Sequence, residues 1–425
     1  MNEAKFSLIY LAYDGIITKS VFDSQVVNPL GHLQKTGQVE ISLIAFENFI
    51  SFFRKYRLLR PKRAQIMQEQ HLAVYFFPRL PGFWGLNLTI FLLRIFGLRW
   101  LKNKLKQRPL IFQGRGVKPA YLGIQIHQAV PRMKVIYDAR AKEAEQYAYP
   151  GLQDERVVLS QLTTRQKKYF KTMLELETAV LKDADYVFSI SSELTKALIP
   201  QIPHPTEITT IANGIDTSRF YFSPELRTRI RTQLGLTDKF CVVYSGSMHP
   251  SQLPGKTVRL FKYIFELDSS SFFLGLTYSS HKLLELLQQE QIPATHYLIL
   301  TKPYTEIVDY LNAGDIGLGL REKNIYNQTS FPVKFAEYLA SGLFPVVSEG
   351  SGDITQWVMR TGYGAIVSNP SDSELKHSAV ELLQQKNQLQ TLALKRQIAE
   401  LAHEEFNQEK LTQRRLSIYH KLVNE

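Results

Sequence analysis

The chain alternates short apolar runs of strand length with stretches of helical periodicity from one end to the other. Because this alternation is typical of parallel sheets with helices on both faces, it predicts an α/β fold. The 425 residues exceed what one hydrophobic core usually supports. We therefore predict two doubly wound, Rossmann-like domains. The predicted strands are Phe6–Ala12, Val39–Ala45, Leu72–Phe77, Leu110–Phe112, Lys134–Tyr137, Tyr186–Ile190 and Ile208–Ile211, then Phe240–Tyr244, Phe272–Leu276, His296–Leu300, Ile316–Gly319, Phe344–Val347 and Gly364–Val367.

A turn-rich connector at Asn213–Pro224 separates the two sets of strands. We predict an N-terminal domain over residues 1–212 and a C-terminal domain over 213–403. A helical pattern over 404–425 is expected to return toward the N-terminal domain. Ligands of doubly wound domains bind at the carboxyl ends of the strands, so a cleft between two facing domains is the expected site.

Positive charge is concentrated in residues 48–137, which hold seventeen Lys or Arg and one acidic residue, Glu69. This segment carries a net +16, whereas the whole chain carries +12, so the remaining residues sum to −4. The same segment includes the most apolar run of the chain, Phe83–Leu101. Basic residues interleaved with Trp, Phe and Leu favour an anionic membrane surface. We therefore predict that residues 48–137 dock on a membrane.

The apolar run is interrupted by Arg94, Arg99 and two glycines, so we expect it to lie at the interface rather than to span the bilayer. The expected docking residues are Arg94, Arg99, Trp100, Lys102, Lys104 and Lys106, with Phe83, Trp84 and Phe91 as further apolar anchors.

The single cysteine, Cys241, lies in an apolar run, which favours a buried thiol in a reducing compartment. The N-terminus has an early acid, Glu3, and no small-residue cleavage motif, so it is a poor secretory signal. We expect a cytoplasmic protein that is peripheral on the inner face of the plasma membrane.

The segment Ser330–Val347 has the pattern of a helix that enters a buried strand. Ser330 is a good N-cap residue, and a helix N-terminus presents free backbone N–H groups to a phosphate. Lys334 and Glu337 are three residues apart and share one helix face. A cation near a diphosphate and a carboxylate near ribose hydroxyls would divide a nucleotide between them. The alternative is an ordinary ion pair on a helix surface.

A second cluster of polar residues, Tyr137–Glu145, follows a predicted strand and includes Asp138 and Arg140. The preceding strand ends at Gln113–Gly116, so both groups are expected at one sheet edge. They are candidates for the reacting centre. The alternative is a local helix cap with an ion pair.

Several segments, in order, resemble the group 1, family 4 glycosyltransferases of the GT-B fold, of the bacterial polysaccharide-assembly type. The resembling segments are Tyr13–Gly15, Asp23–Val27, Ala184–Ser191, Ile211–Phe220, Val243–Gly246, Tyr310–Leu318 and Ser330–Val347. The resemblance implies two facing Rossmann-like domains and transfer of a sugar, with retention, from a nucleotide diphosphate sugar. It implies no cofactor and no obligatory metal.

The resemblance also assigns residues. Glu337 occupies the family's ribose-binding position, and Thr329 stands where the family has the first Glu of its pair. Asp138 stands near the place of a catalytic-region His, with Arg140 beside it. The remaining assignments are Gly246, Lys256 (or Arg259), Ser330 and Lys334 for the donor, and Asp14 and Gly15 for the N-terminal loop.

The sequence thus predicts a hexosyltransferase-type enzyme that uses a nucleotide sugar and a lipid-linked or saccharide acceptor. The alternatives are a GT-B nucleotide-sugar epimerase and a non-catalytic GT-B relative. A nucleic-acid partner is not expected, because the basic segment is rich in long aliphatic side chains and carries no nucleic-acid-binding module.

Overall fold

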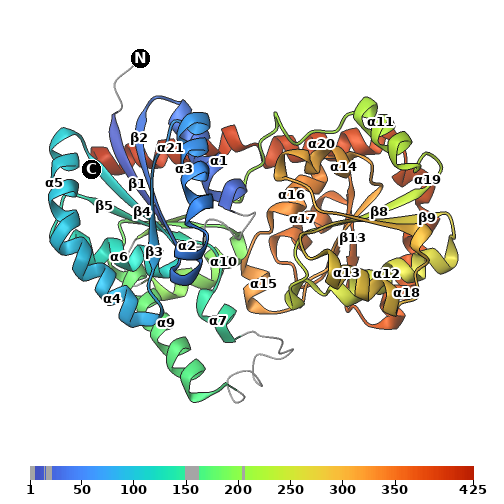
Figure 1. The fold of residues 1–425 in the computed structure, drawn as a ribbon, viewed down its shortest axis with the longest axis horizontal. Helices are drawn as coiled ribbons and strands as arrows, with labels where there is room; N and C mark the ends of the chain where they lie inside the picture. The colour runs from blue at the N-terminus through green and yellow to red at the C-terminus, as the bar shows by residue number, and fades with distance from the viewer. Residues whose placement is uncertain (1–4, 14, 16–21, 149–161, 203–205) are drawn as a thin grey trace. The chain divides into compact units, whose positions relative to one another are not determined.

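The computed structural model describes residues 5–13, 15, 22–148, 162–202 and 206–425, and they form two compact units (Figure 1). The first unit contains the described residues of 1–148 and 161–212 together with 408–425. The second unit contains residues 213–407. The C-terminal helix, α21 (Gln408–Asn424), therefore belongs to the first unit.

The first unit is built on a seven-stranded, entirely parallel sheet of order β3-β2-β1-β4-β5-β6-β7. Its strands are β1 (Phe6–Ala12), β2 (Val39–Asn48), β3 (Ala73–Arg79), β4 (Leu110–Arg115), β5 (Lys134–Ala139), β6 (Tyr186–Ser189) and β7 (Glu207–Thr210). Among its described residues, the helices other than α21 are α1 (Asn28–Lys35), α2 (Phe49–Arg54), α3 (Tyr56–Gln70), α4 (Gly82–Leu92), α5 (Leu98–Gln107), α6 (Val117–His127), α7 (Glu143–Ala148), α9 (Thr164–Asp183) and α10 (Ser192–Leu198), with single turns at Asp23–Val27, Leu93–Gly97 and Ile199–Gln201.

One face of this sheet packs against α1, α3 and α21 in a continuous apolar core. The central strand β1 is buried along its whole length, as expected for a parallel strand covered on both faces. From α21, Leu416, Tyr419 and Leu422 enter this core, and the Tyr419 ring lies 5.8 Å from that of Phe6. The last helix of the chain thus completes the first hydrophobic core.

The second unit has a six-stranded parallel sheet of order β10-β9-β8-β11-β12-β13. Its strands are β8 (Phe240–Ser245), β9 (Ser271–Leu276), β10 (Tyr297–Leu300), β11 (Ile316–Gly319), β12 (Phe344–Ser348) and β13 (Ala365–Val367). Its helices are α11 (Pro224–Leu234), α12 (Pro254–Leu267), α13 (Ser280–Gln289), α14 (Ile307–Asn312), α15 (Ile325–Thr329), α16 (Val333–Ala340), α17 (Asp353–Thr361), α18 (Asp372–Gln384), α19 (Lys386–Leu389) and α20 (Leu392–Glu405), with short turns at Pro250–Gln252, Ala294–His296 and Tyr304–Glu306.

The two parallel sheets confirm the predicted fold class, and each predicted strand is present, with ends that differ by three residues or fewer. The largest differences are at β2 and β4, which continue to Asn48 and Arg115. Polar residues follow the apolar run in both strands, and hydrogen bonding to neighbouring strands keeps these residues extended. Cys241 is buried in β8, as predicted.

A helical run from Gly82 to Gln107, comprising α4, the turn Leu93–Gly97 and α5, is the one helix in the described part of the chain that is long and apolar enough to cross a membrane. It nevertheless contacts the first unit at both ends and in the middle. The Phe83 ring packs 4.9 Å from Tyr169 of α9, Arg94 Nη2 donates to the Gln125 backbone oxygen at 3.0 Å, and Lys104 pairs with Glu40 of β2. The helix therefore lies along the surface of the unit.

A buried ion cluster around Asp315, which directly precedes β11, joins this strand to β8, α11 and α20 in the second unit. The carboxylate is fully buried and accepts the Cys241 backbone N–H at 2.8 Å. Arg227 of α11 pairs with it directly, Arg231 lies 3.4 Å away and Lys395 of α20 lies 3.5 Å away. Burial lowers the pKa of Lys395 to about 7, and the adjacent carboxylate opposes this shift.

The excess positive charge of this cluster is stabilised by backbone carbonyls at the end of α14. Arg227 donates to the oxygens of Asn312, Ala313 and Gly314 at 3.1, 3.1 and 2.6 Å. Because the carbonyl end of a helix carries partial negative charge, these groups compensate the cations that Asp315 alone cannot neutralise.

We predict that Asp315→Asn lowers the free energy of unfolding of the second unit by roughly 3–5 kcal/mol, because it leaves buried cations without their counter-ion. The control is Asp309→Asn, which removes an exposed pair with Arg229 at 3.7 Å. That change should cost less than about 1 kcal/mol. Urea unfolding would be followed by fluorescence of the buried Trp357 in a Trp84→Phe/Trp100→Phe background, which leaves only this reporter. Equal losses in both variants would contradict the prediction.

Candidate functional site

The strongest candidate site of the second unit lies around α16, which follows the carboxyl end of β11 and precedes β12. Glu337 is 7% exposed and accepts a hydrogen bond from the Tyr304 hydroxyl at 2.9 Å. Lys334 donates to Gln252 Oε1 at 2.6 Å, and its ammonium lies 4.8 Å from the centre of the Tyr244 ring. Lys334 and Glu337 therefore bond to other residues and do not form an exposed ion pair on a helix surface, which was the alternative explanation of their spacing.

Burial dominates the electrostatics of this pair. It lowers the pKa of Lys334 to about 7, with repulsion from Arg321 acting in the same direction and Glu337 opposing it. It raises the pKa of Glu337 to about 7, against the Tyr304 hydrogen bond and the Lys334 charge. Strongly shifted titratable groups at strand ends are typical of functional sites.

Arg321 is a further cation of this site that the sequence analysis did not identify. It follows β11, is 5% exposed, and donates to Ser330 Oγ at 2.9 Å and to the Asn327 backbone oxygen at 3.3 Å. Its Nε has no hydrogen-bond partner among the described residues, and burial lowers its pKa to about 10. Its position just after a buried strand was the one available signal.

Gly246, at the end of β8, lies next to Lys334 and has a backbone conformation that favours glycine. Its φ of 138° is unfavourable for other residues, and a Cβ there would lie 3.6 Å from Lys334 Nζ. The preceding Ser245 N–H donates to the Tyr338 hydroxyl at 2.6 Å, which links the β8 end to α16. The structure thus brings together Gly246, Ser330, Lys334 and Glu337 as predicted neighbours.

The predicted N-cap role of Ser330 is wrong. Helix α16 begins at Val333, and its N-cap is Pro332, which makes no side-chain cap hydrogen bond. Ser330 instead ends α15, accepts from Arg321 and donates to the Asn327 oxygen at 3.2 Å. The extended backbone of the intervening Pro332 moves the helix start past Ser330.

Two other donor-site candidates occupy different settings. Thr329 is 1% exposed, and its hydroxyl donates to the Ile325 backbone oxygen at 2.7 Å within α15. Lys256 points toward Asp372 at the start of α18, with Nζ 3.5 Å from Oδ1, and Arg259 pairs with Asp372 and Glu290. The cation beside Glu337 and Gly246 is therefore Lys334, which Arg321 approaches, rather than Lys256 or Arg259.

The candidate site of the first unit surrounds Asp138 at the carboxyl end of β5. The carboxylate is 6% exposed and accepts from the Tyr10 hydroxyl at 2.8 Å, Gln113 Nε2 at 3.2 Å and Arg140 Nη1 at 3.3 Å. Burial alone would raise its pKa, but Arg140, Arg115 and the Tyr10 hydrogen bond outweigh that effect and hold the pKa below its ordinary value. Asp138 is therefore an ionised, multiply hydrogen-bonded group.

Residues distant in the sequence complete this network. Arg115 and Arg140 both donate to Gln25 Oε1, at 2.6 and 3.2 Å, and the Tyr419 hydroxyl of α21 donates to Gln113 Oε1 at 2.6 Å. The two guanidinium groups are thus held side by side at the strand ends. The Asp138–Arg140 ion pair of the alternative interpretation is present.

The first unit also positions the start of α6 and part of the N-terminal loop. Glu143 accepts the Val117 N–H with both carboxylate oxygens, at 3.2 and 3.3 Å. Gly15 has a φ of 81°, a conformation that favours glycine. Asp14 lies outside the described residues. Among the described residues, no group of three or more His, Cys, Asp or Glu could hold a metal ion.

The predicted docking residues divide between the surface and the protein. Arg94, Arg99, Lys102 and Lys106 are exposed, and Arg94 also donates to Gln125 and Gln128. Lys104 is half-buried and pairs with Glu40. Two predicted aromatic anchors, Phe83 and Trp100, pack against Tyr169 and Tyr75. The large apolar side chains that are exposed on this helix are Trp84, Phe91, Leu92, Ile95 and Phe96.

No family model and no curated protein sequence matches the chain. Solved structures do match over nearly its full length. Sucrose-phosphate synthase from Thermosynechococcus elongatus has a TM-score of 0.74 at 15% identity and covers 99% of this chain and 100% of its own. HepE from Anabaena, in complex with UDP and glucose, has a TM-score of 0.67 at 13% identity, with 98% and 100% covered. WaaG, a glycosyltransferase involved in lipopolysaccharide biosynthesis, has a TM-score of 0.62 at 14% identity, with 97% and 99% covered.

The chain has the GT-B fold. This confirms the fold that the sequence resemblance implied, and the low identities limit the conclusion to the fold.

The raised pKa of Glu337 predicts a pH-dependent stability of the second unit. Between pH 4.5, the ordinary value, and about 7, the folded protein binds a proton that the unfolded chain has released, so stability from this group falls as pH rises. Between pH 5 and pH 8, the free energy of unfolding of the wild type should therefore fall by roughly 3 kcal/mol relative to that of Glu337→Gln. Trp357-detected urea unfolding at the two pH values measures this difference. The control, Glu349→Gln, removes an exposed carboxylate. The same pH dependence of the free energy of unfolding in all three proteins would contradict a raised pKa of Glu337.

Proposed function

We propose that this protein is a glycosyltransferase that moves a sugar from a nucleotide diphosphate sugar to an acceptor, with retention at the anomeric carbon. The observation that carries the proposal is the pair of the half-buried Lys334 and the buried Glu337, with Arg321 beside it, at the strand ends of the second unit. The GT-B fold agrees with it. HepE, which shares this fold, was solved with UDP and with UDP-glucose.

In this proposal the second unit binds the donor. Glu337 accepts hydrogen bonds from ribose hydroxyls, in place of the one from Tyr304, and Lys334 exchanges its contact with Gln252 for the diphosphate. Arg321 and the backbone at Gly246 stand nearby. In the reaction the bond from the anomeric carbon to the diphosphate oxygen breaks, and a bond to an acceptor oxygen forms. The acceptor proton passes to the departing diphosphate, whose charge the cations stabilise.

The first unit binds the acceptor in this proposal. Arg115 and Arg140 are oriented by Gln25 and Asp138 at the strand ends. Because Asp138 is ionised and already accepts three hydrogen bonds, we assign it a positioning role rather than proton transfer.

We further propose that the acceptor is lipid-linked and that the protein acts at the inner face of the plasma membrane, in assembly of a surface polysaccharide or glycolipid. The support is an exposed apolar surface inside the basic segment. Trp84, Phe91 and Phe96 are 67%, 57% and 74% exposed on the helix 82–107, and Ile50 and Phe53 of α2 are 71% and 60% exposed. Apolar patches with a cationic border are typical of membrane-binding surfaces.

For donor binding, we predict that Glu337→Ala weakens nucleoside diphosphate affinity by roughly 1.5–3 kcal/mol, the usual cost of losing hydrogen bonds to a charged group. Lys334→Ala should have a similar effect. Calorimetry with UDP, GDP and TDP and their sugars measures both, with Glu349→Ala as the control. The same screen tests the rivals: conversion of the donor without an acceptor would indicate an epimerase, and no binding of any donor would indicate a non-catalytic relative.

For the acceptor side, we predict that Asp138→Asn lowers kcat at least tenfold and leaves donor KM and nucleotide affinity nearly unchanged, because Arg140 loses its orienting charge. Steady-state kinetics and thermal melting test this together. Unchanged turnover would remove the role in catalysis, and an early melt with full activity at low temperature would make the network purely structural.

For membrane binding, we predict that vesicles containing anionic lipid bind the wild type at low salt and release it as salt rises. Trp84→Ser/Phe96→Ser should weaken binding in flotation assays. The matched control, Leu267→Ser/Tyr278→Ser, alters side chains that are 58% and 70% exposed on the second unit and should have no effect. Equally poor binding of the wild type to anionic and neutral vesicles would favour a soluble acceptor.

A further inference from the structure

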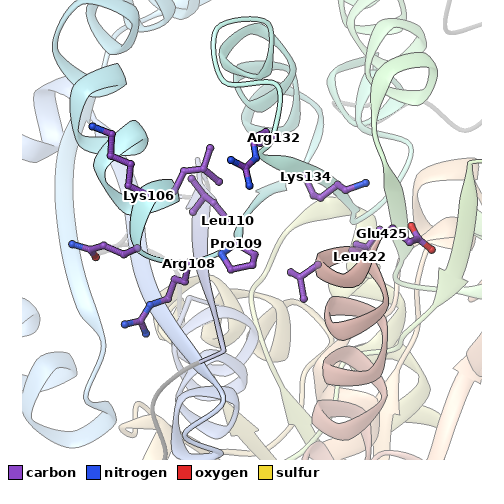
Figure 2. A pocket seen from close by; sticks show the side chains of 11 residues that line it. Lys106, Arg108, Pro109, Leu110, Arg132, Lys134, Leu422 and Glu425 are labelled. Carbon is purple, nitrogen blue, oxygen red and sulfur yellow. The ribbon is translucent and has the colours of Figure 1, made fainter.

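A pocket of about 460 Å³ opens in the first unit at the amino ends of β4 and β5 (Figure 2). Its lining comes from the end of α5 and the segment that leads into β4, from the residues around the start of β5, and from the end of α21. Since Asp138 lies at the carboxyl end of β5 and Arg140 directly follows the strand, this pocket lies at the opposite edge of the sheet from the candidate acceptor site.

The pocket combines a basic border with apolar walls. Lys106, Arg108, Arg132 and Lys134 supply four cations, and Glu425 is the one acidic residue of the lining. Leu105, Pro109 and Val423 supply the accessible apolar surface of the same lining, whereas Leu110 and Leu422 are buried. A ligand that matches this lining has an anionic group joined to an apolar portion.

Nearby carboxylates neutralise only part of this positive charge. Arg108 lies 3.8 Å from Glu40, which Lys104 also contacts, and Lys134 lies 3.7 Å from Asp185. Lys106 and Arg132 are exposed, and neither forms an ion pair with any residue that the structure describes. The pocket therefore retains a net positive charge that a phosphate would neutralise.

We propose that this pocket binds the phosphate headgroup of an acidic membrane lipid. The proposal rests on the membrane part of the proposed function and names its lipid-specific contact. The pocket is continuous with the docking helix, because Leu105, Lys106 and Gln107 end the helical run 82–107 and also line the pocket. A lipid at this helix would place its phosphate at the basic border formed by Lys106 and Arg132 and its first methylene groups against Leu105, Pro109 and Val423.

The test is calorimetry with soluble ligands and the full chain. Dihexanoyl phosphatidic acid, below its micellar concentration, is compared with dihexanoyl phosphatidylcholine, glycerol 3-phosphate and inorganic phosphate. The variant Lys106→Ser/Arg132→Ser removes the two unneutralised pocket cations. The matched control, Arg99→Ser/Lys102→Ser, removes two exposed cations of the same helix that do not line the pocket. Both variants lose the same net charge at exposed positions.

The wild type should bind phosphatidic acid more tightly than the three other ligands. Lys106→Ser/Arg132→Ser should weaken this binding about tenfold or more, as expected for two cations near an anionic headgroup, and Arg99→Ser/Lys102→Ser should change it less than about threefold. Equal losses in both variants would show general electrostatic attraction and overturn the proposal. Equal affinity for inorganic phosphate and phosphatidic acid would assign the pocket to a free anion and also overturn it.

Flotation of the same variants separates this proposal from the membrane proposal itself. If the wild type binds short-chain phosphatidic acid through the pocket but no vesicle, the pocket site stands and membrane docking fails. If the wild type binds anionic vesicles through Trp84 and Phe96 while Lys106→Ser/Arg132→Ser binds phosphatidic acid as the wild type does, docking stands and the pocket proposal fails.

Discussion

Parallel strand pairing is the constraint on which the rest of the structure depends. Within each sheet all strands run the same way, so the loops after the strands collect at one edge and the loops before them at the other. In the first unit this separates Asp138 and Arg140, at and just after the carboxyl end of β5, from Arg132 and Lys134 at its amino end. One seven-stranded sheet therefore presents two chemically different edges, with the Asp138–Arg140 network at one and the cations Arg132 and Lys134 at the other.

The second unit holds two sets of charged side chains shielded from water, and they differ in the partners that stabilise the charges. Around Asp315, three cations share one carboxylate and several backbone carbonyls, so each charged group has a partner within the protein. These contacts tie α11 and α20 to the sheet. Around Lys334 and Glu337, burial also shifts the pKa values toward neutrality, as it does for Lys395, but the side-chain contacts are hydrogen bonds with Gln252 and Tyr304, which a ligand can replace. A site whose charges are desolvated in the absence of ligand gains more from a ligand that restores their partners.

The sequence predicted the strands well because most of them are buried on both faces and appear as continuous apolar runs, such as β8 and β9. It predicted α16 and its polar pair from local spacing. It could not predict Tyr304 against Glu337, or Tyr419 against Gln113, because these pairs lie 33 and 306 residues apart and no local period links them. Ser330 failed as a cap because Pro332, two residues later, governs where the helix begins.

The same limit explains the docking helix. Phe and Trp side chains lie on two faces of the helix 82–107, and the amino-acid composition does not show which face packs against the rest of the first unit. Phe83 and Trp100 pack on neighbouring rings, whereas Trp84 and Phe96 remain exposed. The contacts of the packed face also bear on how this helix could lie relative to a membrane.

A spanning arrangement of that helix would have to break the contacts of Phe83 with Tyr169, of Arg94 with Gln125 and of Lys104 with Glu40. It would also place Arg94 and Arg99 in hydrocarbon, at about 2.5–3.5 kcal/mol each on insertion scales. Lying flat keeps those contacts, leaves the cations at headgroup level and buries only the apolar face that the protein leaves uncovered. The packing of the first unit thus favours a helix on the membrane surface over one across it.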